Sequence, residues 1–208
     1  MKMAKNRQRI LDVSIELFNQ SGVVAITTNH IAQALEISPG NLYFHFRNKE
    51  EIICELFDKM CEATYSVWRH SSEQGDLPPP LELVERSFEV VWQYRFFHRE
   101  SYHLRKKDPT LAKKWRTYVL KTMRLLLANY KQWVKLGVMR PVKDPKEMQM
   151  ISDLVLITSI SLFQFFESPE QPASKKHLKQ GAQHIARLLR PYHSDEMQAS
   201  LQKYILRN

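Results

Sequence analysis

The sequence predicts an all-α protein, and three observations support this prediction. Apolar residues recur at helical spacing along most of the chain, only five glycines occur in 208 residues, and no stretch alternates apolar and polar residues between turn pairs. A chain of this length can bury a sizeable core. We therefore expect helices from end to end and no β-sheet.

Capping signals define the helices of the first 60 residues. Apolar residues at helical spacing indicate a first helix over about 6–20, and Gly22 follows it in the place of a left-handed cap. Thr27 is expected to cap a short second helix that runs through Leu35. Ser38 is expected to cap a third, with Pro39 at its first position, where a missing N–H costs nothing.

A longer helix follows these three short ones. Asn48, with Glu51 three residues on, resembles a capping box and predicts a helix running to about residue 72. The stretch GDLPPP at 75–80 is the strongest breaker in the chain. We predict two domains, one over 1–60 and one over 61–208.

Helical patterns continue after this break. The signals predict a helix over about 80–97, a long one from Asp108-Pro109 to Gly137, an apolar one from Asp144-Pro145 to Phe166, one over about 174–190, and a last one from Ser194. The most apolar stretch, 151–166, has 16 residues, whereas a membrane span needs about 20. The N-terminus MKMAKNRQR has no apolar signal-peptide core. We expect no membrane segment and a cytoplasmic location.

The cysteines and histidines offer no metal or catalytic constellation. Cys54 and Cys61 are seven residues apart on one expected helix, too far to bridge, and are interpreted as packing thiols. The eight histidines are scattered, with no H-E-x-x-H, no glycine-rich phosphate loop and no G-x-S-x-G. We expect no metal, no cofactor and no enzymatic activity.

Positive charge is concentrated in the middle of the chain. The net charge is +9, and residues 95–143 hold fourteen Lys or Arg against two Asp or Glu, while residues 1–60 are neutral overall. Two interpretations stay open. The basic stretch can be a solvated or partner-facing helix surface, or it can mark a site for an anionic effector.

Residues 27–46 predict two short helices joined by a tight turn. Their inward set is expected to be Ile31, Ala32, Leu35, Ile37, Leu42 and Phe46. The outward face of the second helix then carries small residues at its tip followed by aromatic and hydrogen-bonding side chains, not the Lys and Glu of a solvated helix. Such a face suits a helix lying in the major groove of DNA.

Residues 31–50 read IAQALEISPGNLYFHFRNKE. Their pattern and spacing resemble the helix-turn-helix of the TetR family of bacterial regulators, and the resemblance covers about residues 6–60. The length and helical order of the remainder fit the family's regulatory domain. One departure is Glu36, where the family commonly has Gly. If this residue adopts a positive φ, glutamate is strained there by about 1 kcal/mol.

The resemblance implies binding to double-stranded DNA at a palindromic operator. Thr27 or Thr28 would contact a phosphate, Lys49 another, and Tyr43 and His45 phosphates or base edges. Base discrimination would come from residues 39–44, with Phe44 near a thymine methyl. The full set of expected DNA-binding residues is Thr27, Thr28, Ser38, Pro39, Gly40, Asn41, Tyr43, Phe44, His45 and Lys49. Bases of the N-terminal arm, Arg7 and Arg9 among them, would add salt dependence.

The aromatic run at 87–104 has two interpretations. Ordinary core packing is one. By resemblance, the other is a pocket for a small apolar or amphipathic effector, with the anionic case open. The candidates are Phe88, Trp92, Phe96, His98, Tyr102, His103, Trp115 and Tyr118.

The family also implies a homodimer, because a palindromic operator presents two half-sites. The helices near 146–166 and 174–190, with Ile185, Leu188 and Leu189, would pair with their copies as a four-helix bundle. The alternative is that 151–166 is simply the central helix of its own domain. The resulting function is a ligand-responsive regulator, by family habit a repressor; the alternative is a helical ligand-binding module without DNA recognition.

Overall fold

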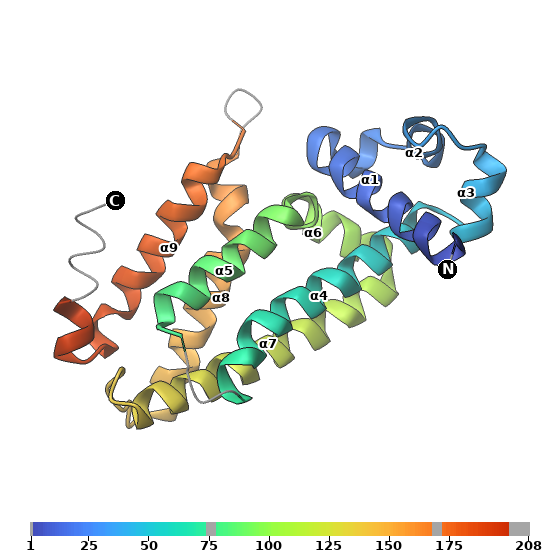
Figure 1. The fold of residues 1–208 in the computed structure, drawn as a ribbon. Coiled ribbons are helices and arrows are strands. Elements are labelled where there is room, and N and C mark those ends of the chain that lie inside the picture. Colours follow the sequence, from blue (N-terminus) through green and yellow to red (C-terminus); the bar gives the residue numbers. More distant parts are fainter. Residues whose placement is uncertain (1, 74–77, 168–171, 200–208) are drawn as a thin grey trace. The chain divides into compact units, whose positions relative to one another are not determined.

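A computed structural model describes residues 2–73, 78–167 and 172–199 of the chain. Among these residues no strand occurs, and one isolated bridge joins Met139 and His193. The all-α prediction is therefore confirmed. The helices (Figure 1) are α1 (Lys2–Ala25), α2 (Thr28–Ala34), α3 (Pro39–His45), α4 (Lys49–Glu73), α5 (Pro80–Gln93), α6 (Arg95–Lys107), α7 (Pro109–Lys135), α8 (Pro145–Phe166), α9 (Lys175–Leu189) and the 3-10 turn η1 (Arg190–Tyr192).

Several predicted element boundaries differ from the structure. α1 continues to Ala25 across a kink at Gly22, whose φ is 78° and ψ 159°, so the glycine bends the helix where an end was predicted. Residues 195–199 are helical after Ser194. The predicted breaks at 75–80 and 168–172 lie partly outside the described residues, and so does the end of the last helix.

The chain divides into two compact units. The first comprises Met1–Glu62 together with Gln93–Trp115. The sequence-based division assigned 93–115 to the second domain, but α6 packs on α1, and the rings of Phe96 and Phe18 lie 5.3 Å apart. The boundary predicted at residue 60 lies close to Glu62, where the first segment of this unit ends, and α6 joins the unit through contacts with α1 that span about 77 residues, as in the Asn19–Phe96 hydrogen bond.

The predicted helix over 80–97 is two helices, with the break at Tyr94. Asn19 binds the backbone groups that the break leaves without helical partners. Its Nδ2 donates to the Gln93 carbonyl at 2.8 Å, and its Oδ1 accepts from the Phe96 N–H at 3.0 Å. Because one buried side chain satisfies both groups, the chain can end α5 and start α6 without a glycine or proline.

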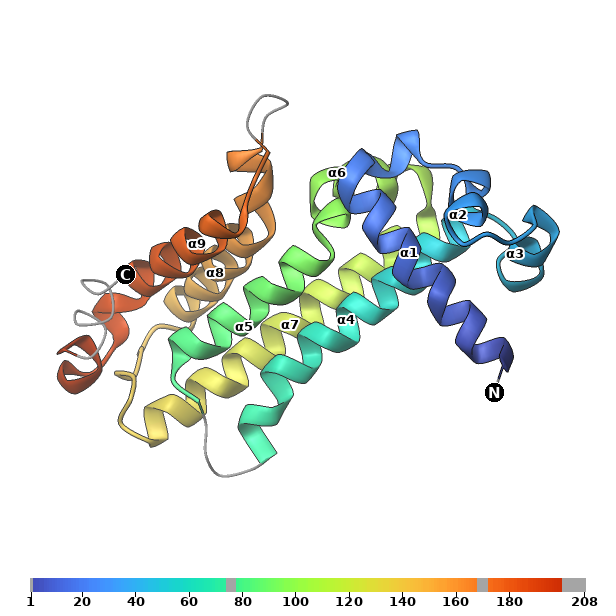
Figure 2. The same cartoon turned by 45° about the horizontal axis from the view of Figure 1, so that its top comes forward.

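The second unit comprises Ala63–Trp92 and Arg116–Asn208. Its core includes Phe88, Val155, Leu162 and Ile185, and α8 and α9 lie side by side within it (Figure 2). Ile185 and Leu189 are buried at 1% and 7% exposure. These two side chains therefore pack inside their own unit, and of the three α9 residues predicted at the dimer contact only Leu188 remains partly accessible.

Gly181 of α9 lies close to Leu162 of α8 and Phe88 of α5. A Cβ at this position would lie 2.6 Å from Leu162 Cδ2 and 2.9 Å from Phe88 Cζ, inside van der Waals contact. Both neighbours are buried in the core and have little room to yield.

We expect Gly181→Ala to lower the free energy of unfolding by about 1 kcal/mol. Overpacking a core costs about 1–3 kcal/mol, and replacing a helical glycine by alanine returns about 1 kcal/mol. Urea denaturation measures the difference, with Gln180→Ala on the same helix as control. A Gly181→Ala protein as stable as its parent would contradict the close packing.

α8 carries the most apolar stretch of the chain. Even so, none of the helices that the structure describes is both long and apolar enough to cross a bilayer.

Candidate DNA-binding interface

Two capped helices build the predicted recognition element. The Thr27 hydroxyl oxygen accepts from the His30 N–H at 3.2 Å, and His30 Nδ1 accepts from the Thr27 N–H at 3.3 Å. The Ser38 hydroxyl oxygen accepts from the Asn41 N–H at 3.2 Å, with Pro39 as the first residue of α3. Both predicted N-caps are confirmed, and Thr27 uses its hydroxyl oxygen within its own helix.

The turn between α2 and α3 is closed by two backbone hydrogen bonds. The Glu36 N–H donates to Gln33 at 3.0 Å, and the Ile37 N–H donates to Ala32 at 3.0 Å. Glu36 has a φ of 56°, which is the left-handed conformation considered above for this position. A glutamate Cβ is crowded there, whereas glycine has no Cβ to clash.

We expect Glu36→Gly to raise the free energy of unfolding by up to about 1 kcal/mol, because relief of left-handed strain exceeds the added freedom of the unfolded chain. Thermal unfolding followed by circular dichroism would measure this, with Glu16→Gly in the exposed middle of α1 as the opposite control, expected to destabilise. A clear drop in melting temperature for Glu36→Gly would refute the strain.

The orientation predicted for α2 and α3 is confirmed. Ile31, Ala32, Leu35, Leu42 and Phe46 are all buried, none above 8% exposure. Ile37 of the same predicted set is half-buried.

The opposite side of α3 is open. Ser38, Pro39, Gly40 and Asn41 are exposed, His45 is half-buried, and the two aromatic side chains at its centre, Tyr43 and Phe44, are 49% and 68% exposed. We call these seven residues the reading edge.

Tyr43 and Thr28 lie together although they belong to different helices. The Tyr43 hydroxyl is 3.0 Å from the Thr28 hydroxyl, and both side chains are solvent-accessible. Two predicted DNA-binding residues thus form one hydroxyl pair at the junction of α2 and α3. Either oxygen can donate, so the pair retains a donor for an incoming phosphate oxygen.

Lys49 stands at the start of α4 as expected, and its side chain also makes two hydrogen bonds within the first unit. Its ammonium donates to the carbonyls of Val23 at 2.6 Å and Ile26 at 2.7 Å, the last turn of α1 and the residue after it. Partial burial lowers the pKa of Lys49. The side chain braces α1 against the start of α4, and at most one of its three N–H groups remains for a phosphate. The positive charge of Lys49 was evident from the sequence, but its hydrogen bonds to the two carbonyls were not.

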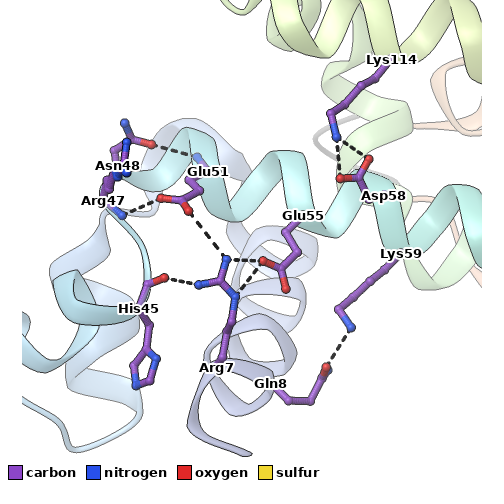
Figure 3. A network of polar contacts seen from close by, with 10 residues as sticks. All are labelled: Arg7, Gln8, His45, Arg47, Asn48, Glu51, Glu55, Asp58, Lys59 and Lys114. Atoms are coloured by element: carbon purple, nitrogen blue, oxygen red, sulfur yellow. Dashed lines mark hydrogen bonds and ion pairs between the residues drawn. The ribbon is translucent and has the colours of Figure 1, made fainter. Parts of the chain in front are cut away.

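Arg7 connects three helices (Figure 3). Its guanidinium donates to the His45 carbonyl at the end of α3 and, from Nε at 2.9 Å, to Glu55 of α4, and it lies 4.0 Å from the centre of the Phe46 ring. Glu51 is 3.7 Å from the same guanidinium. Arg7, which the sequence placed among the bases of the N-terminal arm, thus fixes the end of the reading edge to α1 and α4.

The start of α4 is capped differently from a capping box. The Asn48 side chain accepts from the Glu51 N–H at 2.8 Å as predicted, but the Glu51 carboxylate accepts from the Arg47 N–H at 2.8 Å instead of the Asn48 N–H (Figure 3). Asn48 is confirmed as the cap. The reciprocal bond is shifted by one residue to Arg47, and the other Glu51 oxygen lies 3.7 Å from the Arg7 guanidinium.

The predicted effector-pocket residues are divided between the units. Phe88, Trp92 and Tyr118 belong to the second unit; Phe96, His98, Tyr102, His103 and Trp115 belong to the first. Phe88, Phe96 and Tyr118 are buried, and Tyr102 is 71% exposed. His103 lines a cavity of about 310 Å³ in the first unit. Burial lowers the pKa of His98 to about 4, so its ring is neutral near pH 7.

Phe97 lies in the aromatic run but was not among the predicted pocket residues, and it belongs to an aromatic group in the first unit. Its ring lies 4.7 Å from that of Phe57 and 5.7 Å from that of Trp115, and Arg105 stacks on Trp115 at 4.6 Å. Trp115 is therefore engaged in packing within the first unit. In the same unit the Cys54 thiol donates to Asp108 Oδ2 at 3.2 Å, and burial raises the pKa of this thiol to about 12.

Comparison with known proteins identifies the family of this chain. Residues 10–56 match the family described as bacterial regulatory proteins, tetR family, and residues 70–201 match the family described as bacterial transcriptional repressor. An HTH-type transcriptional regulator of Staphylococcus aureus (strain USA300) is 44% identical over 91 residues, 44% of this chain and 48% of that protein. The regulator AcrR of Shigella flexneri is 37% identical over 54 residues, 26% and 25% of the two chains. The chain thus spans about half or less of these curated relatives.

Solved structures match over a greater length. A TetR-family transcriptional regulator from Marinobacter aquaeolei VT8 is 32% identical and covers 95% of this chain and 96% of its own, with a TM-score of 0.83. Two more distant structures share the fold: the ketosteroid transcriptional regulator KstR2 of Mycobacterium tuberculosis (21% identity, 91% and 96% coverage, TM-score 0.65) and a SmeT–triclosan complex (17%, 92% and 93%, 0.64).

The matched families and relatives are transcriptional regulators, not enzymes. The family matches cover the recognition element and most of the second unit. The chain belongs to the TetR family of bacterial transcriptional regulators.

Proposed function

We propose that this regulator is a repressor that binds a palindromic operator as a homodimer and is released by a small-molecule effector. The observation that carries the proposal is the reading edge. Tyr43 and Phe44 are exposed at 49% and 68% on a short helix held rigidly by two capped turns and by Arg7. Large exposed aromatic side chains on a fixed helix suit insertion into a major groove.

Different residues of the reading edge would contact the phosphates and the bases. The hydroxyl pair of Thr28 and Tyr43 binds one phosphate and sets the register of the helix on the duplex. Phe44 meets a thymine methyl, and Asn41 reaches a base edge. Thr27 and Lys49 contribute mainly by holding α2 and the end of α1 in place.

The proposed dimer rests on an exposed apolar stripe along α8. Its members are Met150, Leu154, Ile157 and Phe165, exposed at 49%, 37%, 58% and 82%. Their spacing keeps them on one side of the helix. An unsatisfied apolar stripe of this kind suits pairing with its own copy across a two-fold axis, which is also the symmetry of a palindrome.

An apolar or amphipathic effector is supported by the relatives. One neighbouring structure is named as a ketosteroid regulator and another is a complex with triclosan. An effector that prefers a conformation with wrongly spaced reading edges would weaken DNA binding by its differential affinity, typically about 1–3 kcal/mol. α4, which starts in the first unit and ends in the second, is the element best placed to carry this coupling.

A gel-shift titration with the DNA upstream of the protein's own gene tests the proposal. We expect a specific complex in which two protomers occupy one site and whose affinity falls steeply between low and physiological salt, because each neutralised phosphate releases counterions. Equal affinity for unrelated DNA, or affinity that ignores salt, would contradict operator recognition. A protein that binds ligand but no DNA would instead support the ligand-binding module.

A further inference from the structure

An open groove of about 750 Å³ lies in the second unit, between the second half of α7, the loop that follows it and the start of α8. None of the eight residues predicted for an effector pocket lines it. Its volume falls in the range of small-molecule sites, about 300–1,000 Å³.

The floor of the groove is apolar and its outer wall is fixed. Met123, Leu127, Val134 and Met148 are among the residues that line it. The loop forms the wall because Tyr130 binds it twice: its hydroxyl donates to the Arg140 carbonyl at 2.9 Å and accepts from the Val142 N–H at 2.7 Å. The groove is therefore preformed.

The charged residues that line the groove, which we call its rim, are all cations. Arg124, Lys131, Lys135 and Lys143 line the groove, and no Asp or Glu does. Because a helix turns about 100° per residue, the first three lie on one side of α7. Other cations of the basic stretch have carboxylate partners, such as Lys114 with Asp58 and Arg140 with Asp195. The four rim cations form no ion pair with any carboxylate in the part of the chain that the structure describes.

The groove also adjoins a smaller apolar space. A cavity of about 40 Å³ in the core shares Tyr130, Met148 and Ser152 with it, and its other walls include Trp68 and Trp133. Methionine side chains rearrange at low cost. A hydrocarbon chain lying on the floor could extend toward this space by displacing Met148, while its head stays among the rim cations.

We infer that this groove binds a single-chain amphipathic anion: a hydrocarbon tail of medium length carrying one carboxylate. Like charges gathered without carboxylates favour an anionic occupant, and the apolar floor favours an alkyl tail. A second copy of the chain fits less well. The α8 residues that line the groove, Met148 and Ser152 among them, lie on the opposite side of the helix from the exposed stripe through Ile157. Only the effector role of the anion rests on the proposed function; binding does not.

The experiment measures decanoate binding by the whole protein without DNA, by calorimetry and thermal shift, beside decanol and decyltrimethylammonium. We expect decanoate to bind and to stabilise the protein. Decanol and decyltrimethylammonium should bind with about tenfold lower affinity or less, because the loss of one ion pair of about 1.4 kcal/mol corresponds to a factor of ten. The double variant Lys131→Gln, Lys135→Gln should weaken decanoate by at least that factor. Arg116→Gln, an exposed α7 cation outside the groove, should change it less than about twofold.

A second variant fills the groove with a larger side chain. Met123→Trp places a large ring on the floor and should block decanoate while the melting temperature without ligand stays near that of the parent. Equal binding of all three amphiphiles, or decanoate binding that ignores both groove variants, would overturn the inference. So would binding to anionic vesicles without binding to monomeric decanoate, or a groove variant that alters only the sedimentation of the protein. Decanoate binding by a protein that binds no DNA would sustain this inference and defeat the proposed function.

Discussion

Replacing Tyr43 and Phe44 together by alanine is expected to lower operator affinity by about 1,000-fold or more while leaving the fold intact. Side chains that read a base step or fix a register contribute about 1–3 kcal/mol each, and a homodimer contains each of them twice. Both side chains are exposed, so their removal should change stability by no more than about 0.5 kcal/mol. Gel-shift titration and thermal unfolding measure the two effects separately.

Two further variants locate the cause. Tyr43→Phe removes only the hydroxyl beside Thr28 and should produce a smaller loss that is similar for all DNA sequences, since a phosphate contact carries no base information. Val24→Ala, an exposed apolar site of the same unit at 74% exposure, should leave operator binding unchanged. If the double alanine variant still binds operator like its parent, the reading edge is not the DNA-binding surface.

The variant Ile157→Glu is expected to convert a dimer into monomers and to weaken operator binding by about 10² to 10⁴, the contribution of a second linked binding site. Ile157 is 58% exposed at the centre of the α8 stripe. Near a two-fold axis its glutamate would face its own copy, so that burial and like-charge repulsion both oppose association. Sedimentation velocity at micromolar concentration measures the assembly, and a gel shift on a full and a half operator measures binding.

Leu136→Glu is the matched control for this change. Leu136 is 55% exposed on the turn after α7 and does not belong to the α8 stripe. Its glutamate variant should sediment like the parent. If Ile157→Glu remains a dimer with unchanged operator affinity, α8 is not the interface, and the alternative in which this helix serves only its own unit gains support.

The predictions from sequence succeeded where the determining contacts are local. The caps at Thr27, Ser38 and Asn48 were predictable because each involves a residue and the backbone three positions later. The burial of Leu42 and the exposure of Tyr43 followed from helical periodicity alone.

The sequence-based predictions missed contacts whose partners lie far along the chain. Arg7, Lys49 and Asn19 were recognisable as polar residues, but their partners lie 23 to 77 positions away. The break at Tyr94 has no local signal, because the side chain that satisfies it comes from α1. For the same reason, the residues predicted for one pocket belong to two different units. The groove was not predicted either, because its lining residues come from α7, a loop and α8.

By itself, the sequence determined the all-helical architecture, the recognition element and its reading edge, and the resemblance to the TetR family. These depend on spacing within one or two helical turns, which amino-acid order records directly. Only the tertiary structure decided that Arg7 and Lys49 serve as braces, that the residues of α6 join the first unit, and that an apolar groove is lined by four cations with no carboxylate partner among the described residues. Those features depend on which distant segments meet, and burial of apolar surface, which drives that meeting, is non-directional and leaves no fixed spacing in the sequence.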